Sequence, residues 1–207
     1  TFAGALPDAN KFGVPGTTNG TGTNAKFNSP KGIVRDANGN FYVTEYDNFV
    51  IRKITSAGVV STLAGNMTVT GKKDGTGSGA EFAGPYGIAI LDNNYIVVSD
   101  FDNGTIRKVH MTTGVVTTIA GSAGDNRIVD GSLSSARFLN PRGVAVADGK
   151  IYVCDASTLR VIDINAGTVS TFAGSKDNAD NKDGVGANAR FGILGGIAYD
   201  GGTKLYV

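Results

Sequence analysis

The sequence repeats itself with a period of about 55 residues, and this repeat limits the possible folds more than any other feature. A phenylalanine recurs at intervals of 55, 56 and 53 residues, at Phe27, Phe82, Phe138 and Phe191. A glycine followed by an aliphatic residue comes five positions later each time, at Gly32, Gly87, Gly143 and Gly196. Three copies close on Ala-Gly, and the same signature opens the chain as Thr1-Phe2-Ala3-Gly4. A fixed period of this length predicts stacked supersecondary units that bury their apolar faces against one another.

Each repeat contains short segments that are typical of β-strands. In the second copy they span residues 87–90, 95–100, 105–109 and 115–120, and they are rich in Ile, Val and Thr. Clusters of Asp, Asn and Gly separate them and predict tight turns. Four antiparallel strands per unit are typical of a β-propeller blade, with the first strand at the axis and the fourth at the outer edge. A β-solenoid fits less well, because its coils are usually shorter and lack this hairpin pattern.

The motifs within the repeat resemble those of the NHL repeat family. In the first copy, Phe-x-x-Pro-x-Gly-Ile spans residues 27–33, Asp-Asn-x-x-Ile-Arg-Lys spans 47–53 and Thr-x-Ala-Gly spans 62–65. The third copy departs from the pattern after Asp155, and Phe49 and Gly104 stand where the family often has a histidine. The resemblance covers nearly the whole chain. It implies a β-propeller, which in this family serves mostly as an interaction scaffold and only occasionally as an enzyme.

We therefore expect an all-β fold, a β-propeller of four-stranded antiparallel NHL-type blades, as a single region over residues 1–207. The blades are expected to start near residues 24, 79, 135 and 188. About four blades are visible, whereas NHL propellers most often have about six, so we expect part of a larger ring. The opening Thr-Phe-Ala-Gly segment is expected to supply the outer strand of the last blade and to close that ring.

Charge, hydropathy and cysteine content exclude several classes of partner and bond. The net charge is +1 with no basic stripe, so nucleic acid is not expected as a partner. No apolar run approaches the ~18 residues of a spanning helix, so no membrane insertion is expected in this segment. Cys154 is the only cysteine, which excludes an internal disulfide. It lies in a strand-like run and is expected to be a buried thiol used as a small apolar residue.

An acidic residue and an arginine recur at matching positions of three repeats. The acid ends the second strand and the arginine follows in the third, which gives the pairs Glu45 and Arg52, Asp100 and Arg107, and Asp155 and Arg160. The pairs could form a charged ring for binding or a structural contact within each hairpin. We favour the structural interpretation, because a residue present in every blade serves the blade, whereas a binding site is expected to break the repeat symmetry.

The sequence offers no catalytic residues and no cofactor, and only weak metal candidates. Asp177, Asp180 and Asp183 form an oxygen-rich cluster of the kind that calcium prefers, although their spacing differs from that of an EF-hand loop. His110 is the only histidine, and a single histidine with a buried cysteine does not supply the ligands of a catalytic zinc site. There is also no G-x-S-x-G elbow and no phosphate-binding loop.

Two features concern the surface. Acceptor sequons begin at Asn19, Asn66 and Asn103, and these asparagines are candidate N-glycosylation sites if the protein is secreted.

The segment Asp8–Thr23 is the longest irregular loop. An extended loop on a rigid scaffold is a sensible place for recognition, so this loop is our candidate for a partner contact.

The sequence thus favours a non-catalytic binding or structural scaffold, extracellular or on the cell surface, that contacts other proteins or glycans through its loops. Self-association is also expected, because an exposed outer strand is a template for another chain. The alternative is a metal-dependent lyase, or a hydrolase of lactones or esters, on an NHL-like propeller whose ligands lie partly outside this segment. Tightly bound zinc or calcium would favour that alternative.

Overall fold

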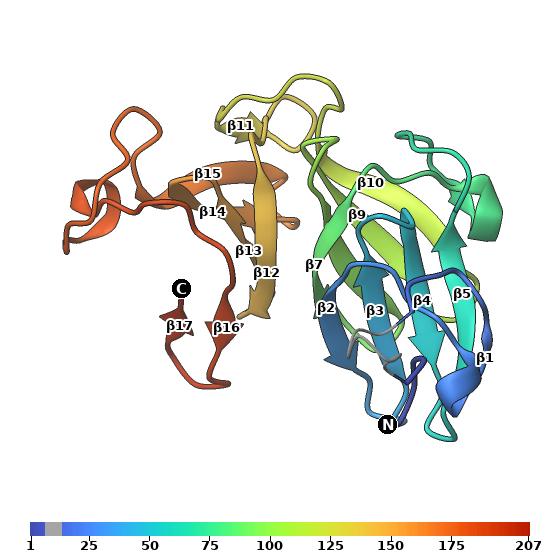
Figure 1. Ribbon diagram of the computed structural model, residues 1–207. Coiled ribbons are helices and arrows are strands. Elements are labelled where there is room, and N and C mark those ends of the chain that lie inside the picture. Colours follow the sequence, from blue (N-terminus) through green and yellow to red (C-terminus); the bar gives the residue numbers. More distant parts are fainter. Residues whose placement is uncertain (7–13) are drawn as a thin grey trace.

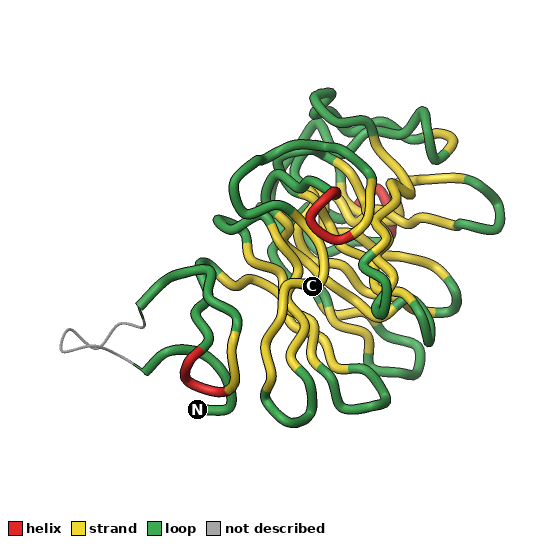
Figure 2. Tube along the Cα trace, turned by 90° about the vertical axis from the view of Figure 1, so that its right-hand side faces the viewer, coloured by secondary structure: helices red, strands yellow, loops and turns green. Residues whose placement is uncertain are grey.

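The computed structural model describes residues 1–6 and 14–207, and it contains three five-stranded antiparallel sheets followed by a two-stranded one. The sheets follow one another like the blades of a fan (Figures 1 and 2). Within each of the first three, four main strands are joined by consecutive hairpins. This arrangement confirms the all-β propeller blades that the repeat pattern predicts.

In the first three repeats, the four main strands match the four segments expected of a repeat. The first blade contains β1 (Gly20–Thr21), β2 (Pro30–Arg35), β3 (Phe41–Glu45), β4 (Val50–Ile54) and β5 (Val59–Gly65). The second contains β6 (Gly75–Thr76), β7 (Pro85–Ile90), β8 (Tyr95–Asp100), β9 (Thr105–His110) and β10 (Val115–Gly121). The third contains β11 (Gly131–Ser132), β12 (Pro141–Ala147), β13 (Lys150–Asp155), β14 (Thr158–Asp163) and β15 (Thr168–Gly174). The fourth repeat contributes β16 (Ala198–Tyr199) and β17 (Leu205–Tyr206).

A fifth, two-residue strand lies on the outer side of each complete sheet, where the sequence predicts only a loop. β1 pairs with β5, β6 with β10 and β11 with β15. A short 3-10 helix follows the first two of them, at Gly22–Asn24 and Gly77–Gly79, and a third spans Gly186–Asn188. We expected the fourth strand to be the outermost strand of the blade. This is wrong for the first residues of that strand, because they pair with a short strand from the loop that enters the blade. This cover weakens the case for self-association through that edge.

The inner strands β2, β7 and β12 approach one another closely at the axis (Figure 1). A Cβ atom on Gly32 would lie 2.9 Å from the carbonyl oxygen of Tyr86, and one on Gly87 would collide with the carbonyl oxygen of Arg142. Real Cβ atoms essentially never approach another atom that closely. The recurrent glycine of the repeat is thus required by the packing of one blade against the next.

The hydrophobic core lies between the blades. Residues of the first blade such as Tyr42 and Ile51 pack against the second blade, where Phe82 and Ile96 are completely buried. An equivalent cluster joins the second and third blades. The aliphatic residue that follows the axial glycine shows how a neighbouring blade buries the inner strand. Ile88 of the second blade, which has the first blade before it, is 7% exposed, whereas Ile33 of the first blade is 62% exposed.

The opening segment Thr1–Gly4 forms no strand, but it packs on the first blade. A Cβ on Gly4 would lie 3.6 Å from the ring of Phe27, just as one on Gly65 would lie 3.1 Å from the ring of Phe82. The segment thus takes the place that the end of an outer strand takes against the following blade. It pairs with neither strand of the fourth repeat in the described part of the chain, so ring closure stays a prediction. None of the helices among the described residues is long and apolar enough to cross a membrane.

Candidate functional site

The recurrent acid and arginine meet as buried ion pairs in all three complete blades. An arginine Nη1 atom lies 2.6 Å from Glu45, 2.9 Å from Asp100 and 3.0 Å from Asp155 in the successive blades. All six side chains are fully buried, and each pair joins the second and third strands of its own sheet. Burial raises the pKa of Asp100 and Asp155, and the charge of the facing arginine opposes that rise.

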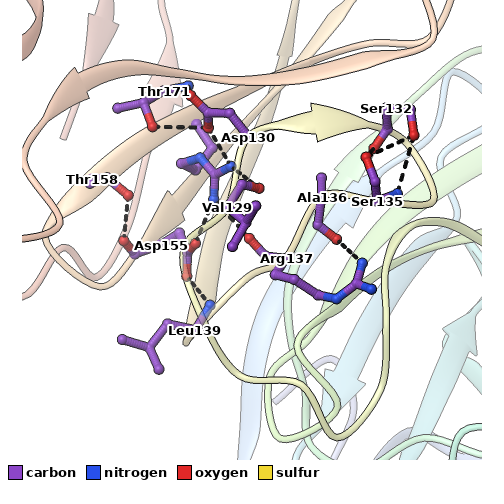
Figure 3. A network of polar contacts seen from close by, with 11 residues as sticks. Val129, Asp130, Ser132, Ser135, Ala136, Arg137, Leu139, Asp155, Thr158 and Thr171 are labelled. Carbon is purple, nitrogen blue, oxygen red and sulfur yellow. Dashed lines mark hydrogen bonds and ion pairs between the residues drawn. The ribbon is translucent and has the colours of Figure 1, made fainter.

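Each of these arginines also ties its hairpin to the loop that enters the blade. In the third blade, Arg160 Nη2 donates to Asp130 Oδ1 at 2.7 Å, and Asp130 in turn accepts hydrogen bonds from the amide and hydroxyl of Thr171 (Figure 3). The guanidinium carbon also lies 5.1 Å from the ring centroid of Phe138, the phenylalanine that marks the repeat. Asp74 takes the place of Asp130 in the second blade and Asn19 takes it in the first. In each complete blade, these contacts join residues of the same blade.

A hydroxyl or thiol in the second strand of each blade bonds to the next blade. Thr44 Oγ1 donates to the carbonyl oxygen of Tyr86 at 2.6 Å, and Ser99 Oγ donates to that of Arg142 at 2.5 Å. Cys154 occupies the same position in the third blade, with its Sγ 3.4 Å from the carbonyl oxygen of Gly196. Cys154 is completely buried, and this burial raises the pKa of its thiol to about 12.

The candidate metal ligands do not converge. The described residues hold no group of three or more His, Cys, Asp and Glu side chains placed to bind a metal ion. Asp177 pairs with the adjacent Lys176, and Asp180 accepts a hydrogen bond from the following amide. Asp183 lies in the same exposed loop. His110 uses Nδ1 to accept hydrogen bonds from the amides of two threonines in the turn after β9, in a different blade from Cys154.

The candidate glycosylation sites differ in access. Asn103 is 8% exposed, and its Nδ2 donates to the carbonyl oxygen of Gly71 and to Asp100. The prediction that Asn103 is a glycan acceptor is therefore wrong, because its side-chain amide nitrogen is buried and already donates hydrogen bonds. Asn19 is exposed, although its Oδ1 accepts from Arg52, and Asn66 is half-buried in a turn.

The proposed recognition loop Asp8–Thr23 is described only in part, because residues 7–13 lie outside the described residues. Its second half is bound to the first blade. The carbonyl oxygen of Thr18 and the side chain of Asn19 both accept hydrogen bonds from Arg52, and β1 pairs with β5. This half of the loop is therefore part of the blade.

The sequence did not single out a group of five side chains at the end of the blades where the inner strands begin. We call it the aromatic–cation cluster, and its members are Lys31, Tyr46, Tyr86, Phe101 and Arg142. Three of them are the second residues of β2, β7 and β12, and the other two directly follow β3 and β8. The cluster thus joins three blades.

The rings of the cluster lie close together, and two cations lie near them. The Tyr46, Tyr86 and Phe101 centroids are 5.9 to 6.4 Å apart. Lys31 Nζ lies 5.8 Å from the Tyr86 centroid, and Arg142 Cζ lies 5.9 Å from it. Next to the cluster, the inner-strand glycines line an axial hollow of about 180 Å³ that Lys31 and Tyr86 also border.

A sequence signal for this cluster does exist. In the three complete repeats, the residue between Pro and Gly of the motif is Lys31, Tyr86 or Arg142. The residue that follows the recurrent acid is Tyr46, Phe101 or Ala156. These positions vary while their neighbours repeat, which is the broken symmetry expected of a binding site. Only the structure shows that the variable positions of different blades lie together.

No family model matches the chain. Over 90% of its length it is 26% identical to NHL repeat-containing protein 2 of Homo sapiens, and it spans 30% of that relative. Among solved structures it resembles an auxiliary nutrient binding protein from Bacteroides ovatus, with a TM-score of 0.62 and 21% identity over 86% of this chain and 44% of that one. It also resembles virginiamycin B lyase from Staphylococcus aureus, with a TM-score of 0.53 and 17% identity over 83% of this chain and 60% of that one.

The two solved structures include a binding protein and an enzyme, and at these identities they show the fold alone. The chain covers less than a third of the curated relative, so that relative's activity as a whole protein does not transfer to it. What the comparison does support is the repeat type, because it extends across all the blades. The chain is a β-propeller built from repeats that are similar to those of NHL repeat-containing proteins.

Proposed function

We propose that this propeller is a non-catalytic binding module, extracellular or on the cell surface, that holds a protein or glycan partner at the aromatic–cation cluster. The cluster is the single observation that carries this proposal. Its three rings and Arg142 are only half-buried, Lys31 is exposed, and the group lies where the repeat pattern is broken. Half-buried aromatic side chains with a few polar groups are the usual lining of binding sites.

The donor chemistry of the described residues favours binding over catalysis. Cys154 is buried with a raised pKa, so its thiol stays protonated near neutral pH and makes a poor nucleophile. His110 is held by backbone amides of its own turn. The proposed binding role is also supported by a structural neighbour that is named an auxiliary nutrient binding protein.

A ligand array tests the proposal directly. The chain is applied to an array of saccharides and peptides, and its pattern is compared with those of Tyr86→Ala and Phe172→Ala. Phe172 is a matched control, because it is an aromatic residue that is 52% exposed in the outer strand β15. We expect bound ligands that Tyr86→Ala loses and Phe172→Ala keeps. Ligands retained by Tyr86→Ala, or conversion of a bound ligand into product, would overturn the proposal.

A further inference from the structure

We propose that the aromatic–cation cluster binds an acidic saccharide, with its carboxylate held by the cations Lys31 and Arg142 and its ring against the half-buried aromatic side chains. This inference rests on the proposed function, since it names the ligand class of the same site. It follows from three properties of the cluster: cations without a carboxylate partner among the described residues, aromatic side chains that are only half-buried, and a nearby carboxylate that can accept hydrogen bonds from hydroxyl groups.

The two cations of the cluster differ from the three buried arginines of the fold. Arg52, Arg107 and Arg160 each face a carboxylate. Among the described residues, neither Lys31 nor Arg142 has a carboxylate within ion-pairing distance, and the buried Nε of Arg142 has no hydrogen-bond partner. Both approach the same ring, that of Tyr86, from neighbouring blades. An anion bound to either cation would gain charge-assisted hydrogen bonds.

The aromatic part of the cluster suits the apolar C–H face of a sugar ring. Tyr46 stands nearly perpendicular to Tyr86, at an interplanar angle of 86°, while Tyr86 and Phe101 are tilted by 33°. The three rings are therefore inclined to one another and do not form a flat stack. The adjacent hollow of about 180 Å³ is lined largely by glycine and aliphatic residues, so it can take an apolar ring edge without losing hydrogen bonds.

The acidic groups beside the cluster decide between kinds of anion. Asp102 Oδ2 accepts a hydrogen bond from the Tyr46 hydroxyl at 2.8 Å, and Asp102 is exposed. Its remaining lone pairs are available to the hydroxyl groups of a sugar. Asp102 and Asp47 both raise the pKa of Tyr46, in addition to the larger effect of burial, so both negative charges act on the cluster. These negative charges disfavour a densely anionic partner, such as a run of acidic residues or a polyphosphate. A saccharide with one carboxylate per sugar ring carries a lower charge density and is therefore the anion that we expect.

Tyrosine fluorescence and calorimetry can test this inference on the chain itself, because it contains 7 Tyr and no Trp. The probe is digalacturonate, and galactobiose is its uncharged counterpart. We expect saturable binding of digalacturonate and at least about tenfold weaker binding of galactobiose, as loss of a hydrogen-bonded charge typically gives. Lys31→Gln and Arg142→Gln should each weaken digalacturonate binding by about tenfold, and Arg142→Lys by less.

The chain offers a matched control on the same strand. Arg35 ends β2 at the opposite end from Lys31 and stacks over Phe41 at 5.8 Å. Arg35→Gln removes one positive charge, as Lys31→Gln does, and should leave binding unchanged. Thermal unfolding of each variant shows whether the blades remain folded, and the charge-preserving Arg142→Lys separates loss of charge from loss of packing.

Each outcome has a defined meaning. Equal affinity for the two disaccharides would overturn the inference while leaving a glycan-binding function intact. Binding of digalacturonate that persists in both glutamine variants would place its site elsewhere and would also overturn it. A hexa-aspartate peptide that binds more tightly than digalacturonate would show that the cluster selects anionic peptides. No binding of either disaccharide would reject the saccharide, and the array with Tyr86→Ala would still judge the binding function separately.

Discussion

Arg107 Nη1 lies 2.9 Å from Asp100 Oδ2, and both side chains are completely buried. The same guanidinium donates to the carbonyl oxygens of Lys73 and Glu81 and to the side chain of Asp74. One residue thus links the middle hairpin of the blade to the loop that enters it. The third blade repeats this arrangement, and the first does so with Glu45 as its acid.

Removing one partner of this pair should destabilise the fold strongly. Arg107→Met leaves Asp100 buried without its counter-charge, and we expect a loss of about 3–5 kcal/mol in the free energy of unfolding. Urea denaturation measures this loss. Arg127→Met is the control, because Arg127 forms an exposed ion pair with Asp125 and should change stability little. Equal losses in the two variants would contradict the structural role of the buried pair.

The axial glycines should tolerate no side chain. Gly87→Ala directs a methyl group at the carbonyl oxygen of Arg142 in the next blade, and we expect a loss of about 2 kcal/mol from overpacking. Gly79→Ala provides the comparison, since a Cβ there would meet no atom within 4 Å. Unfolding curves should place Gly79→Ala within about 0.5 kcal/mol of the parent. The close approach of the blades would be refuted if Gly87→Ala were equally neutral.

Exchanging the donors that bridge the blades should move stability in opposite directions. A hydroxyl is a stronger hydrogen-bond donor than a thiol, so Cys154→Ser should strengthen the contact to Gly196 and Ser99→Cys should weaken the contact to Arg142. Each change should be about 1 kcal/mol. Chemical denaturation of the two single variants and of the double exchange tests this expectation. A gain in Ser99→Cys would be incompatible with the bridging role.

The buried thiol should also make the fold less stable in alkali. Burial raises the pKa of Cys154 from 9.0 to about 12, with the charge of Asp155 adding to the rise. A raised pKa in the folded state contributes stability that is complete below pH 9.0 and is lost as the pH rises toward about 12. The loss from this group is up to about 1.4 kcal/mol per pH unit.

Cys154→Ser should remove this component of the pH dependence. The variant and the parent are compared by urea denaturation at several values between pH 8 and pH 11, a window that brackets the onset of thiol ionisation in the unfolded chain. The difference in stability between them should shift steadily in favour of the variant as the pH rises. A difference that is independent of pH would mean that the thiol ionises equally in the folded and unfolded chain.

The repeat by itself determines the blade and its internal contacts. Glu45 and Arg52 lie within one hairpin, and the alternation of strand and turn residues fixes the register that brings them together. Because these contacts span few residues and recur in every copy, the sequence pattern was sufficient to predict them.

The tertiary structure decided the contacts between segments that are distant in the chain. The short strand β6 pairs with β10 across about forty residues, and the aromatic–cation cluster brings Tyr46 to Phe101 and Tyr86 to Arg142. No periodicity shows which side chains of neighbouring blades face one another, because that depends on the rotation of one blade against the next. The sequence therefore determined the blade, whereas the packing of the blades created the surface on which a ligand would bind.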